Sequence, residues 1–442
     1  MKRKKFLREL NLLDASLLVV GCIIGAGIFR TPATIATHLH TPFLVLLIWL
    51  FGGLFSLCGA LCYSELASSF PKTGGDYIYL TEAYGRITGF LFGWTKLFIE
   101  RTGTIAVLAF VFAEYLRFIF QYGEETLKGV ACLAILLLTV VNIVGVRFGK
   151  YVQNFFTFLK CGAILGIVLS GLLRAPAIPS SWHPFFPETF SMGTIQSLGV
   201  ALIFVLWTYG GWTEAAYVAE EVKDPERNLP RAIVFGLLLT MVLYLLVNSV
   251  YLYYIPIGEM TSDKLVAATA VQKMVGGIGG KLVALMVASS AFGALNGYIL
   301  TGARILYALG EDHPLFGRLA KLHPDFHTPN IALWFNAAVA TILVLTKSFE
   351  DILTYTTVAI WVFFGMAGFS VILLRKKVPD RKGTYRVWGY PVTPLLFVLT
   401  TLFFILNACL KEPNGALFGL AIVALGFPLY FLSSRFKSRQ AA

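Results

Sequence analysis

Apolar stretches of about twenty residues recur along the whole chain, separated by short polar segments. A helix of that length crosses roughly 30 Å of hydrocarbon, so each stretch predicts a transmembrane helix. Segments of about ten residues with alternating polarity, typical of membrane β-barrels, do not occur in the sequence. The pattern therefore predicts an all-α membrane protein with twelve spans, at about 12–35, 43–69, 90–120, 127–147, 152–174, 193–220, 231–257, 278–309, 329–346, 351–375, 391–410 and 415–433.

Two of these spans carry glycine clusters where a continuous helix is otherwise expected. Span 1 contains Gly21, Gly25 and Gly27, and span 6 contains the adjacent pair Gly210 and Gly211. Each glycine costs about 1 kcal/mol inside a helix, so a cluster favours local unwinding. Close helix packing through the Gly21 and Gly25 pair is the alternative. The matched placement, with each cluster opening a set of five spans, favours broken helices 1 and 6 in an inverted repeat.

The chain shows no Pro-, Gly- or Ser-rich linker and no low-complexity tract. We therefore expect one membrane domain over residues 1–442. Its first five-helix repeat would cover about 12–174 and its second about 193–375. Two additional helices would follow at about 391–433.

Composition strengthens the membrane assignment, and the charge distribution orients it. The chain is 57% hydrophobic and 14% charged, against about 25% charged residues in soluble proteins. With both termini on one side, 25 of the 36 Lys and Arg residues fall on that side and 9 on the other, while Arg101 and Lys160 lie within spans. The positive-inside rule then puts both termini in the cytoplasm. The net charge of +12 is assigned to topology and the lipid bilayer, and no nucleic-acid partner is expected.

Cysteine and histidine placement argues against metal, disulfide and enzyme chemistry. All six cysteines fall inside predicted spans. The six histidines lie in predicted loops without metal-ligand spacing, so we expect them to be solvated. No His, Asp or Cys cluster has catalytic spacing within a span, so we expect no enzyme and no cofactor. The basic start has no cleavage site, and the short tails do not favour a sensor with a soluble extension.

Broken helices suit a zwitterionic substrate. A carboxylate and an ammonium are costly to bury unpaired, whereas a helix break offers free N–H groups on one side and free C=O groups on the other. In span 1 the N–H donors would be Ala26 and Gly27, and Ile23 would supply a carbonyl. In span 6, Trp207 and Thr208 would supply carbonyls. We expect substrate amino and carboxyl groups to bind at Ile23, Gly25, Ala26, Gly27, Trp207, Thr208 and Gly210.

Several motifs together resemble a known family. The matching pieces, in order, are GCIIGAGIFRTP, SELASSFPKTGGDYIYL, WTYGGWTEAAYVAEEVKDPERNLPRA, FGALNGYILTGARILYALGED and LHPDFHTPNIAL. Over about residues 10–375 the chain resembles the amino acid–polyamine–organocation superfamily, and within it the L-type amino-acid transporter family in its bacterial form. The resemblance implies twelve spans in a five-plus-five inverted topology. It also implies sodium-independent exchange or uptake of amino acids across the inner (plasma) membrane by alternating access.

Lys160 lies deep in span 5, far from either end. A charge at this depth is expensive and indicates a functional site, with a structural counter-ion as the alternative. The resemblance implies that this lysine faces span 1, where sodium-coupled relatives hold a cation. It would be a fixed positive charge that replaces sodium, or a proton carrier, and we favour the fixed charge. Ala294 stands where many relatives have a serine near the lysine.

The resemblance also implies a gate and a side-chain pocket. Trp207 precedes the second break and corresponds to a family gating aromatic, although packing is the commoner role of an aromatic in a span. The side-chain pocket would involve Glu100, Thr104, Glu214 and Asn296, of which Asn296 would also hydrogen-bond across helices. Two carboxylates there would favour a cationic side chain, unless internal salt bridges neutralise them.

Ion pairs are expected at several other charged positions. Glu100 can pair with Lys96 one turn earlier, whereas the adjacent Arg101 should not face Glu100. Glu65 and the pair Glu220 and Glu221 would form structural or gating ion pairs, with Arg227 and Arg231 as candidate partners.

Eukaryotic members of the family carry a cysteine between spans 3 and 4 that tethers a glycoprotein subunit. The corresponding segment, EYLRFIFQYGEETLKG, contains none, so no covalent heavy subunit is expected. The leading hypothesis is a sodium-independent amino-acid exchanger. A proton-coupled symporter and a cationic amino-acid or amine permease are the alternatives.

Overall fold

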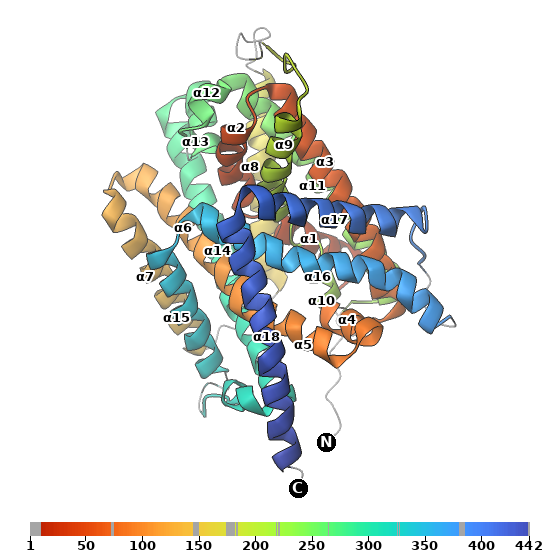
Figure 1. Ribbon diagram of the computed structural model, residues 1–442. Helices are drawn as coiled ribbons and strands as arrows, with labels where there is room; N and C mark the ends of the chain where they lie inside the picture. The colour runs from red at the N-terminus through yellow and green to blue at the C-terminus, as the bar shows by residue number, and fades with distance from the viewer. Residues whose placement is uncertain are drawn as a thin grey trace. The chain divides into compact units, whose positions relative to one another are not determined.

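The computed structural model describes residues 10–71, 75–144, 150–173, 182, 184–217, 219, 222–263, 265–324, 326, 328–379 and 385–440. Within these residues the chain is almost entirely helical (Figure 1). The first helices are α1 (Leu12–Ile23), α2 (Gly27–His38), α3 (Pro42–Ser69), α4 (Asp76–Tyr84), α5 (Arg86–Thr95), the π-helix η1 (Lys96–Arg101), α6 (Thr102–Phe120), α7 (Glu124–Val144), α8 (Lys150–Leu173) and α9 (Met192–Thr208). The later helices are α10 (Glu214–Tyr217), α11 (Pro225–Tyr254), α12 (Ile257–Met260), α13 (Val266–Val275), α14 (Gly277–Asp312), the 3-10 helix η4 (Pro314–Ala320), α15 (Asn330–Thr346), α16 (Phe349–Lys377), α17 (Val392–Lys411) and α18 (Pro413–Gln440).

Helices occupy all twelve predicted spans. Nine helical segments in the described part of the chain are long and apolar enough to cross a membrane, by length and composition. Shorter apolar helices at Thr157–Leu173, Met192–Thr208 and Asn330–Thr346 occupy the positions of spans 5, 6 and 9. The prediction of an all-α, multi-pass membrane protein is therefore confirmed.

Three helices lie in segments that the sequence pattern assigned to loops. These are α4, α12 and α13, and each has ten residues or fewer. Hydropathy detects segments long enough to cross a bilayer, so helices this short carry no span signal. The most consequential of them is α4, because its first residue contacts α10, the helix that follows the second break.

The chain divides into two compact units, each built from three segments. The first unit comprises Met1–Gly89, Gly149–Val266 and Trp361–Asn407, and the second comprises the rest. The first unit thus takes spans 1, 2 and 5 from one predicted repeat and spans 6, 7 and most of 10 from the other. The inverted relation between the repeats, and the single-domain organisation, stay predictions.

Close helix packing holds the first unit together. A Cβ added at Gly52 of α3 would lie 2.2 Å from Cγ1 of Val205 in α9, so the two helices approach only because this position lacks a side chain. Beside it, Trp49 packs edge-on against Tyr209 and Tyr244, with ring centroids 5.9 and 5.5 Å away. Such aromatic pairs add about 0.5–1.5 kcal/mol each beyond their burial. This aromatic group surrounds the second break.

In the second unit, α6 packs against α14, α7 and α15. Asn142 of α7 donates to Asn296 Oδ1 of α14 at 2.7 Å, which confirms the predicted hydrogen bond between helices at Asn296. Trp94 Nε1 of α5 donates to the Ile422 carbonyl of α18 at 2.8 Å.

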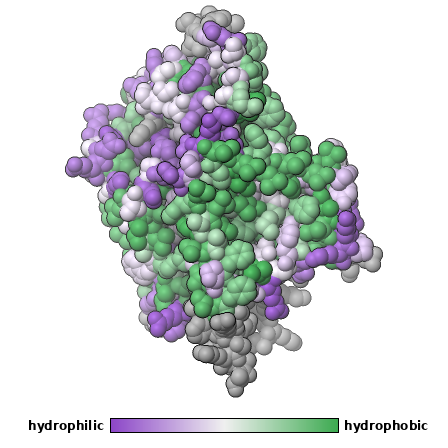
Figure 2. All heavy atoms as spheres, viewed as in Figure 1, coloured by the Kyte–Doolittle hydropathy of each residue, from purple (hydrophilic) through white to green (hydrophobic). Residues whose placement is uncertain are grey.

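Exposed apolar side chains cover the outer faces of several helices, and Figure 2 shows hydrophobic residues spread across one face of the molecule. On α17 the exposed residues include Leu399, Leu402 and Leu406, at 62%, 51% and 63% of their full accessibility. An exposed apolar face of this extent is unfavourable in water and favourable against lipid tails.

Candidate substrate site

The first helix break separates α1 from α2. The helix that begins at Leu12, with an Asn11 and Asp14 capping box, ends at Ile23, and a new helix begins at Gly27. The N–H of Gly25 donates to the Ile23 carbonyl at 2.7 Å, which turns the chain out of helical geometry. Because α2 starts afresh, its first N–H groups lack acceptors inside the helix until Phe29, whose N–H donates to the Ala26 carbonyl at 3.2 Å. The predicted break in span 1 is therefore present.

The second break separates α9 from α10. Helix α9 ends at Thr208 and α10 begins at Glu214, with a turn between them. Gly211 in this turn has φ +109°, a conformation that strains any residue with a Cβ. A Cβ added there would lie 2.7 Å from the carbonyl carbon of Cys22 in α1. Gly211 thus allows the second break to touch the end of α1.

Side chains of the second break also contact the start of α2. The hydroxyl oxygens of Thr31 and Thr208 lie 2.9 Å apart, and either can be the donor. A Cβ added at Gly27 would lie 2.9 Å from Trp207 Cζ3 and from the Thr208 side chain. The structure therefore brings together Gly27, Trp207 and Thr208, which the sequence assigned to one site.

Tyr244 of α11 joins the two breaks and was missed by the sequence reasoning. Its hydroxyl donates to the Ile23 carbonyl at 2.8 Å and shares the same hydrogen with the Thr208 carbonyl at 3.3 Å. Both carbonyls were expected to be free for substrate, and this expectation is corrected, because each already accepts from the phenol. A carbonyl oxygen has a second lone pair, so it can still accept from a substrate ammonium. A tyrosine in an apolar span carries no signal of such a role.

The third carbonyl expected to bind substrate, that of Trp207, also accepts a hydrogen bond within the protein. The Trp207 oxygen accepts from the Gly210 N–H at 2.9 Å, which closes the turn after α9. A Cβ added at Gly25 would meet only the Ile23 oxygen, 3.9 Å away, so Gly25 borders open space.

Lys160 faces the first break region from α8. Its side chain is buried, with 6% of the residue exposed, and Nζ donates to the Gly21 carbonyl of α1 at 3.4 Å. Within the described residues no carboxylate forms an ion pair with Lys160. The expected orientation toward span 1 is therefore observed, while the functional role of the lysine stays a prediction.

The predicted side-chain pocket residues divide between the two units. Glu214 opens α10 in the first unit, whereas Glu100, Thr104 and Asn296 belong to the second. Thr104 is buried within α6. A pocket assembled from all four residues therefore stays a prediction.

Glu100 lies inside the π-helix η1, and its charge is balanced locally. Its Oε2 is 3.3 Å from Lys96 Nζ, as expected, and 3.3 Å from Arg101 Nε. The expectation that adjacent Glu100 and Arg101 would not meet is wrong. Here the helix is wider than an α-helix, and the long arginine side chain reaches back to its neighbour. Two cations and one carboxylate leave this group with a net positive charge.

Glu65 has a different partner from the one expected. Its buried carboxylate accepts from Arg375 Nε and Nη2 of α16 at 2.8 and 2.6 Å, and from the Val387 N–H at 2.7 Å. The candidate partners Arg227 and Arg231 are therefore wrong for Glu65. The segment after α16 folds back onto the end of α3, a tertiary arrangement with no sequence signal. Glu220 and Glu221 lie outside the described residues.

The backbone beside this ion pair is also bound to α3. The Tyr385 N–H donates to Ser68 Oγ at 3.2 Å. Burial raises the pKa of the Tyr385 phenol, so the group stays neutral at physiological pH.

Within the described residues, no group of three His, Cys, Asp or Glu side chains could hold a metal ion, and the six cysteines are free thiols. Two histidines are less solvated than expected. His38 closes α2 and stacks on Phe204 at 5.9 Å, and His313 packs edge-on against Phe90 at 4.6 Å. Both contacts are tertiary, which is why the loop assignment missed them.

The multi-pass helical fold and the two touching helix breaks define a membrane transporter. The chain matches the model of the family described as amino acid permease over residues 10–428. The chain belongs to this family, and it is a transporter of amino acids and not an enzyme. The predicted resemblance to the amino acid–polyamine–organocation superfamily is confirmed.

Individual relatives agree with this membership. The chain is 33% identical to the serine/threonine exchanger SteT of Bacillus subtilis, over 96% of each chain. It is also 33% identical to the mouse b(0,+)-type amino acid transporter 1, over 99% of this chain and 90% of the relative. The chain is 32% identical to the mouse large neutral amino acids transporter small subunit 2, over 96% of this chain and 81% of the relative.

Proposed function

We propose that this protein is a sodium-independent amino-acid exchanger that works by alternating access. Its substrate binds by its amino and carboxyl groups at the two helix breaks. The observation that carries this proposal is the contact between the breaks. The start of α2 and the ends of α1 and α9 meet through Gly211, Thr31 and Tyr244.

Helix-end electrostatics explains why a zwitterion fits here. The N-terminus of α2 carries partial positive charge, and its N–H groups before Phe29 have no acceptor within the helix, so this end attracts the carboxylate. The C-termini of α1 and α9 carry partial negative charge, which attracts the ammonium. Each interaction contributes about 0.3–1 kcal/mol, and up to about 2 kcal/mol where partly buried. Gly25 adds open space at this point, so a small ligand group can approach the backbone.

Lys160 supports sodium independence. Its ammonium donates to the Gly21 carbonyl, two residues before the last residue of α1. A fixed positive charge at this carbonyl can do what a bound cation would do, namely stabilise the C-terminal end of a broken helix. In the leading mechanism the lysine remains charged throughout the cycle.

A specific observation favours proton-coupled symport as the second candidate. Among the described residues, Lys160 Nζ makes one hydrogen bond, and this bond is long, at 3.4 Å. A buried lysine with so weak a bond would lose little interaction energy on becoming neutral. In that case Lys160 would bind and release the coupled proton.

Side-chain selection is proposed to favour neutral amino acids. Because Lys96 and Arg101 balance Glu100, that carboxylate does not attract a cationic side chain. Trp207 is proposed as the gate, and Thr104, Glu214 and Asn296 as further pocket residues. A cationic amino-acid or amine permease remains the alternative if Glu214 dominates. The relatives differ here, since one is named for serine and threonine and another for large neutral amino acids.

We further propose an inner-membrane location with both termini in the cytoplasm, as the 25 to 9 distribution of Lys and Arg indicates. The protein should work without a covalently attached heavy subunit, because the segment between spans 3 and 4 contains no cysteine. Transport by the purified single chain would support this part of the proposal.

Reconstituted proteoliposomes test the proposed function. Exchange predicts that uptake of a labelled neutral amino acid requires unlabelled amino acid inside and does not respond to sodium. Accumulation in empty vesicles driven by an inward proton gradient would instead establish symport. Competition by a panel of amino acids identifies the side chain. Stronger competition by lysine, arginine or amines than by neutral amino acids would overturn the proposed neutral preference.

A further inference from the structure

Asp76, the first residue of α4, is a fully buried carboxylate with two phenol partners. The Tyr63 hydroxyl of α3 donates to its Oδ1, and the Tyr217 hydroxyl of α10 donates to its Oδ2. Asp76 and Tyr63 have no solvent exposure. Hydrogen bonds to an ionised acceptor in a dry site are roughly twice as strong as neutral ones. The carboxylate therefore ties three separate helices together.

One of these helices continues directly from the second break. Helix α10 contains only Glu214–Tyr217, too short to be stable by its own backbone hydrogen bonds. It starts three residues after Gly211, whose backbone touches the end of α1. The position of α10 must therefore come from tertiary contacts, and the bond from Tyr217 to Asp76 is one of them.

The backbone before Asp76 is shaped for this contact. Gly75 has φ +47°, and a Cβ added there would lie 3.0 Å from the Tyr217 ring. The Tyr217 ring thus packs closely over Gly75, so its hydroxyl reaches the carboxylate of the next residue.

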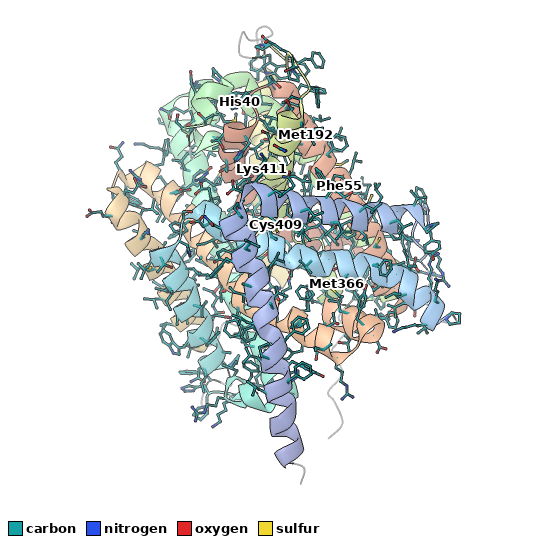
Figure 3. The ribbon with its side chains drawn as sticks, viewed as in Figure 1. His40, Phe55, Met192, Met366, Cys409 and Lys411 are labelled. Atoms are coloured by element: carbon teal, nitrogen blue, oxygen red, sulfur yellow. The ribbon has the colours of Figure 1, made fainter. Side chains whose placement is uncertain are left out.

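The far end of α4 is attached elsewhere. The Tyr84 hydroxyl donates to the Met366 carbonyl of α16 at 2.7 Å, and Lys377 Nζ donates to the Ala83 carbonyl at 2.7 Å. Figure 3 labels Met366 on α16. Contacts with α16 therefore fix the last turn of α4, and the first residue of α4 in turn holds α10.

We propose that Asp76 is a positioning residue for transport, which holds α10, and through it the second helix break, by accepting the Tyr217 hydroxyl. The inference rests on the proposed function, because it concerns the break at which substrate binds. Without this bond α10 is less ordered in the substrate-free protein. Substrate binding must then order α10, which reduces the binding free energy and lowers the affinity for amino acid. Neither Asp76 nor Tyr217 needs to touch the substrate.

Tyr217→Phe is the main test, because it removes one hydroxyl and keeps the ring over Gly75. In the purified full chain we expect the Kd for the transported amino acid to rise about tenfold, the scale of one charge-assisted hydrogen bond. Asp76→Asn should weaken binding by at least as much. If Tyr217 acts through Asp76, adding Tyr217→Phe to Asp76→Asn should cause no further loss of affinity.

The rate at which Cys22 reacts with a maleimide distinguishes a positioning role of Tyr217 from a general effect on stability. In protein with the other five cysteines replaced by serine, a maleimide should modify Cys22 several-fold faster in Tyr217→Phe, because Gly211 then covers the α1 end less often. The matched control is Tyr254→Phe, which removes a phenol bond to the Gly171 carbonyl elsewhere in the first unit. It should leave both Kd and the Cys22 rate unchanged.

The inference is overturned if wild type binds amino acid and Tyr217→Phe binds within twofold of it, or if the two substitutions are additive. Failure of wild type to bind any amino acid would instead refute the proposed function. If Tyr217→Phe does not fold, Tyr63→Phe carries the same test through the other carboxylate oxygen, with a threefold or greater rise in Kd expected and an unchanged Kd contradicting the proposal.

Discussion

The two helix breaks use glycine in opposite ways. The first break spans three residues, Ile24 to Ala26, and no described residue in it has positive φ. Its Gly25 borders open space. The second break spans Tyr209 to Thr213, and its Gly211 has φ +109° with the α1 backbone pressed against it.

Glycine clusters in two broken helices can therefore have different structural roles. The second break needs a glycine to be built, since a side chain would displace α1. The first break could be built without one, so its glycine keeps room for a ligand. The following predictions test that distinction, beginning with the largest expected effect.

Gly211→Ala should abolish transport and lower thermal stability. The added Cβ meets backbone atoms at 2.7 Å, which cannot yield as a flexible side chain can, and the residue must also hold φ +109°. We expect at least a roughly 100-fold loss of uptake and a clear fall in Tm. Gly129→Ala, where nothing lies within 4 Å, is the control and should match wild type. Normal uptake by Gly211→Ala would mean that the breaks do not touch as described.

Lys160→Ala should remove transport while expression and folding persist. The substitution deletes the charge at the Gly21 carbonyl and leaves the helix contacts of α8 largely intact. Uptake should fall by about 100-fold in proteoliposomes, because a charge buried this deep in a membrane span marks a functional group. The exposed Lys281 offers a control, and Lys281→Ala should transport normally. Wild-type rates in Lys160→Ala would refute the assigned role.

Gly25→Ala should weaken substrate binding without destabilising the protein. A methyl group here meets no protein atom closer than 3.9 Å, so it fills only the space assigned to substrate. We expect a rise in Kd of about tenfold or more at an unchanged Tm. Gly166→Ala, also in open space but on α8, should change neither quantity. A drop in Tm for Gly25→Ala would erase the contrast between the two breaks.

Thr31→Val should have the smallest effect. It removes the hydroxyl contact between α2 and α9 and the bond from the Thr31 hydroxyl to the Gly27 carbonyl of its own helix. Thr208 keeps its bond to the Phe204 carbonyl at 2.8 Å. A loss near one neutral hydrogen bond predicts a Kd increase of about threefold, measured by ligand binding. Thr31→Ser keeps the hydroxyl and should restore wild-type affinity. Equal affinities for Val and Ser would show that the hydroxyl pair does not help to align the breaks.

Much of the fold could be predicted because the bilayer imposes simple rules on sequence. Long apolar runs, the glycine clusters of spans 1 and 6 and the single deep lysine are all visible without a structure. The short helix α4 was missed, since nine residues produce no span signal. The partner of Glu65 was assigned wrongly, because Arg375 lies 310 positions further along the chain.

Within the site, sequence identified residues but not their contacts. Ile23 and Thr208 were correctly placed at helix ends, yet nothing in the chain indicated that Tyr244 binds both of their carbonyls. The role of Asp76 was equally hidden, because its two partners lie on helices that sequence analysis does not bring together.

The amino-acid sequence alone establishes that this chain is a helical membrane protein, where its helices break and which charge lies deepest. These properties follow from local composition, since hydrocarbon solvates apolar helices and glycine weakens them wherever it occurs. Only the tertiary structure decided which groups meet at the breaks. Hydrogen bonds and close packing act over a few ångströms between helices hundreds of residues apart, and no local pattern encodes that proximity.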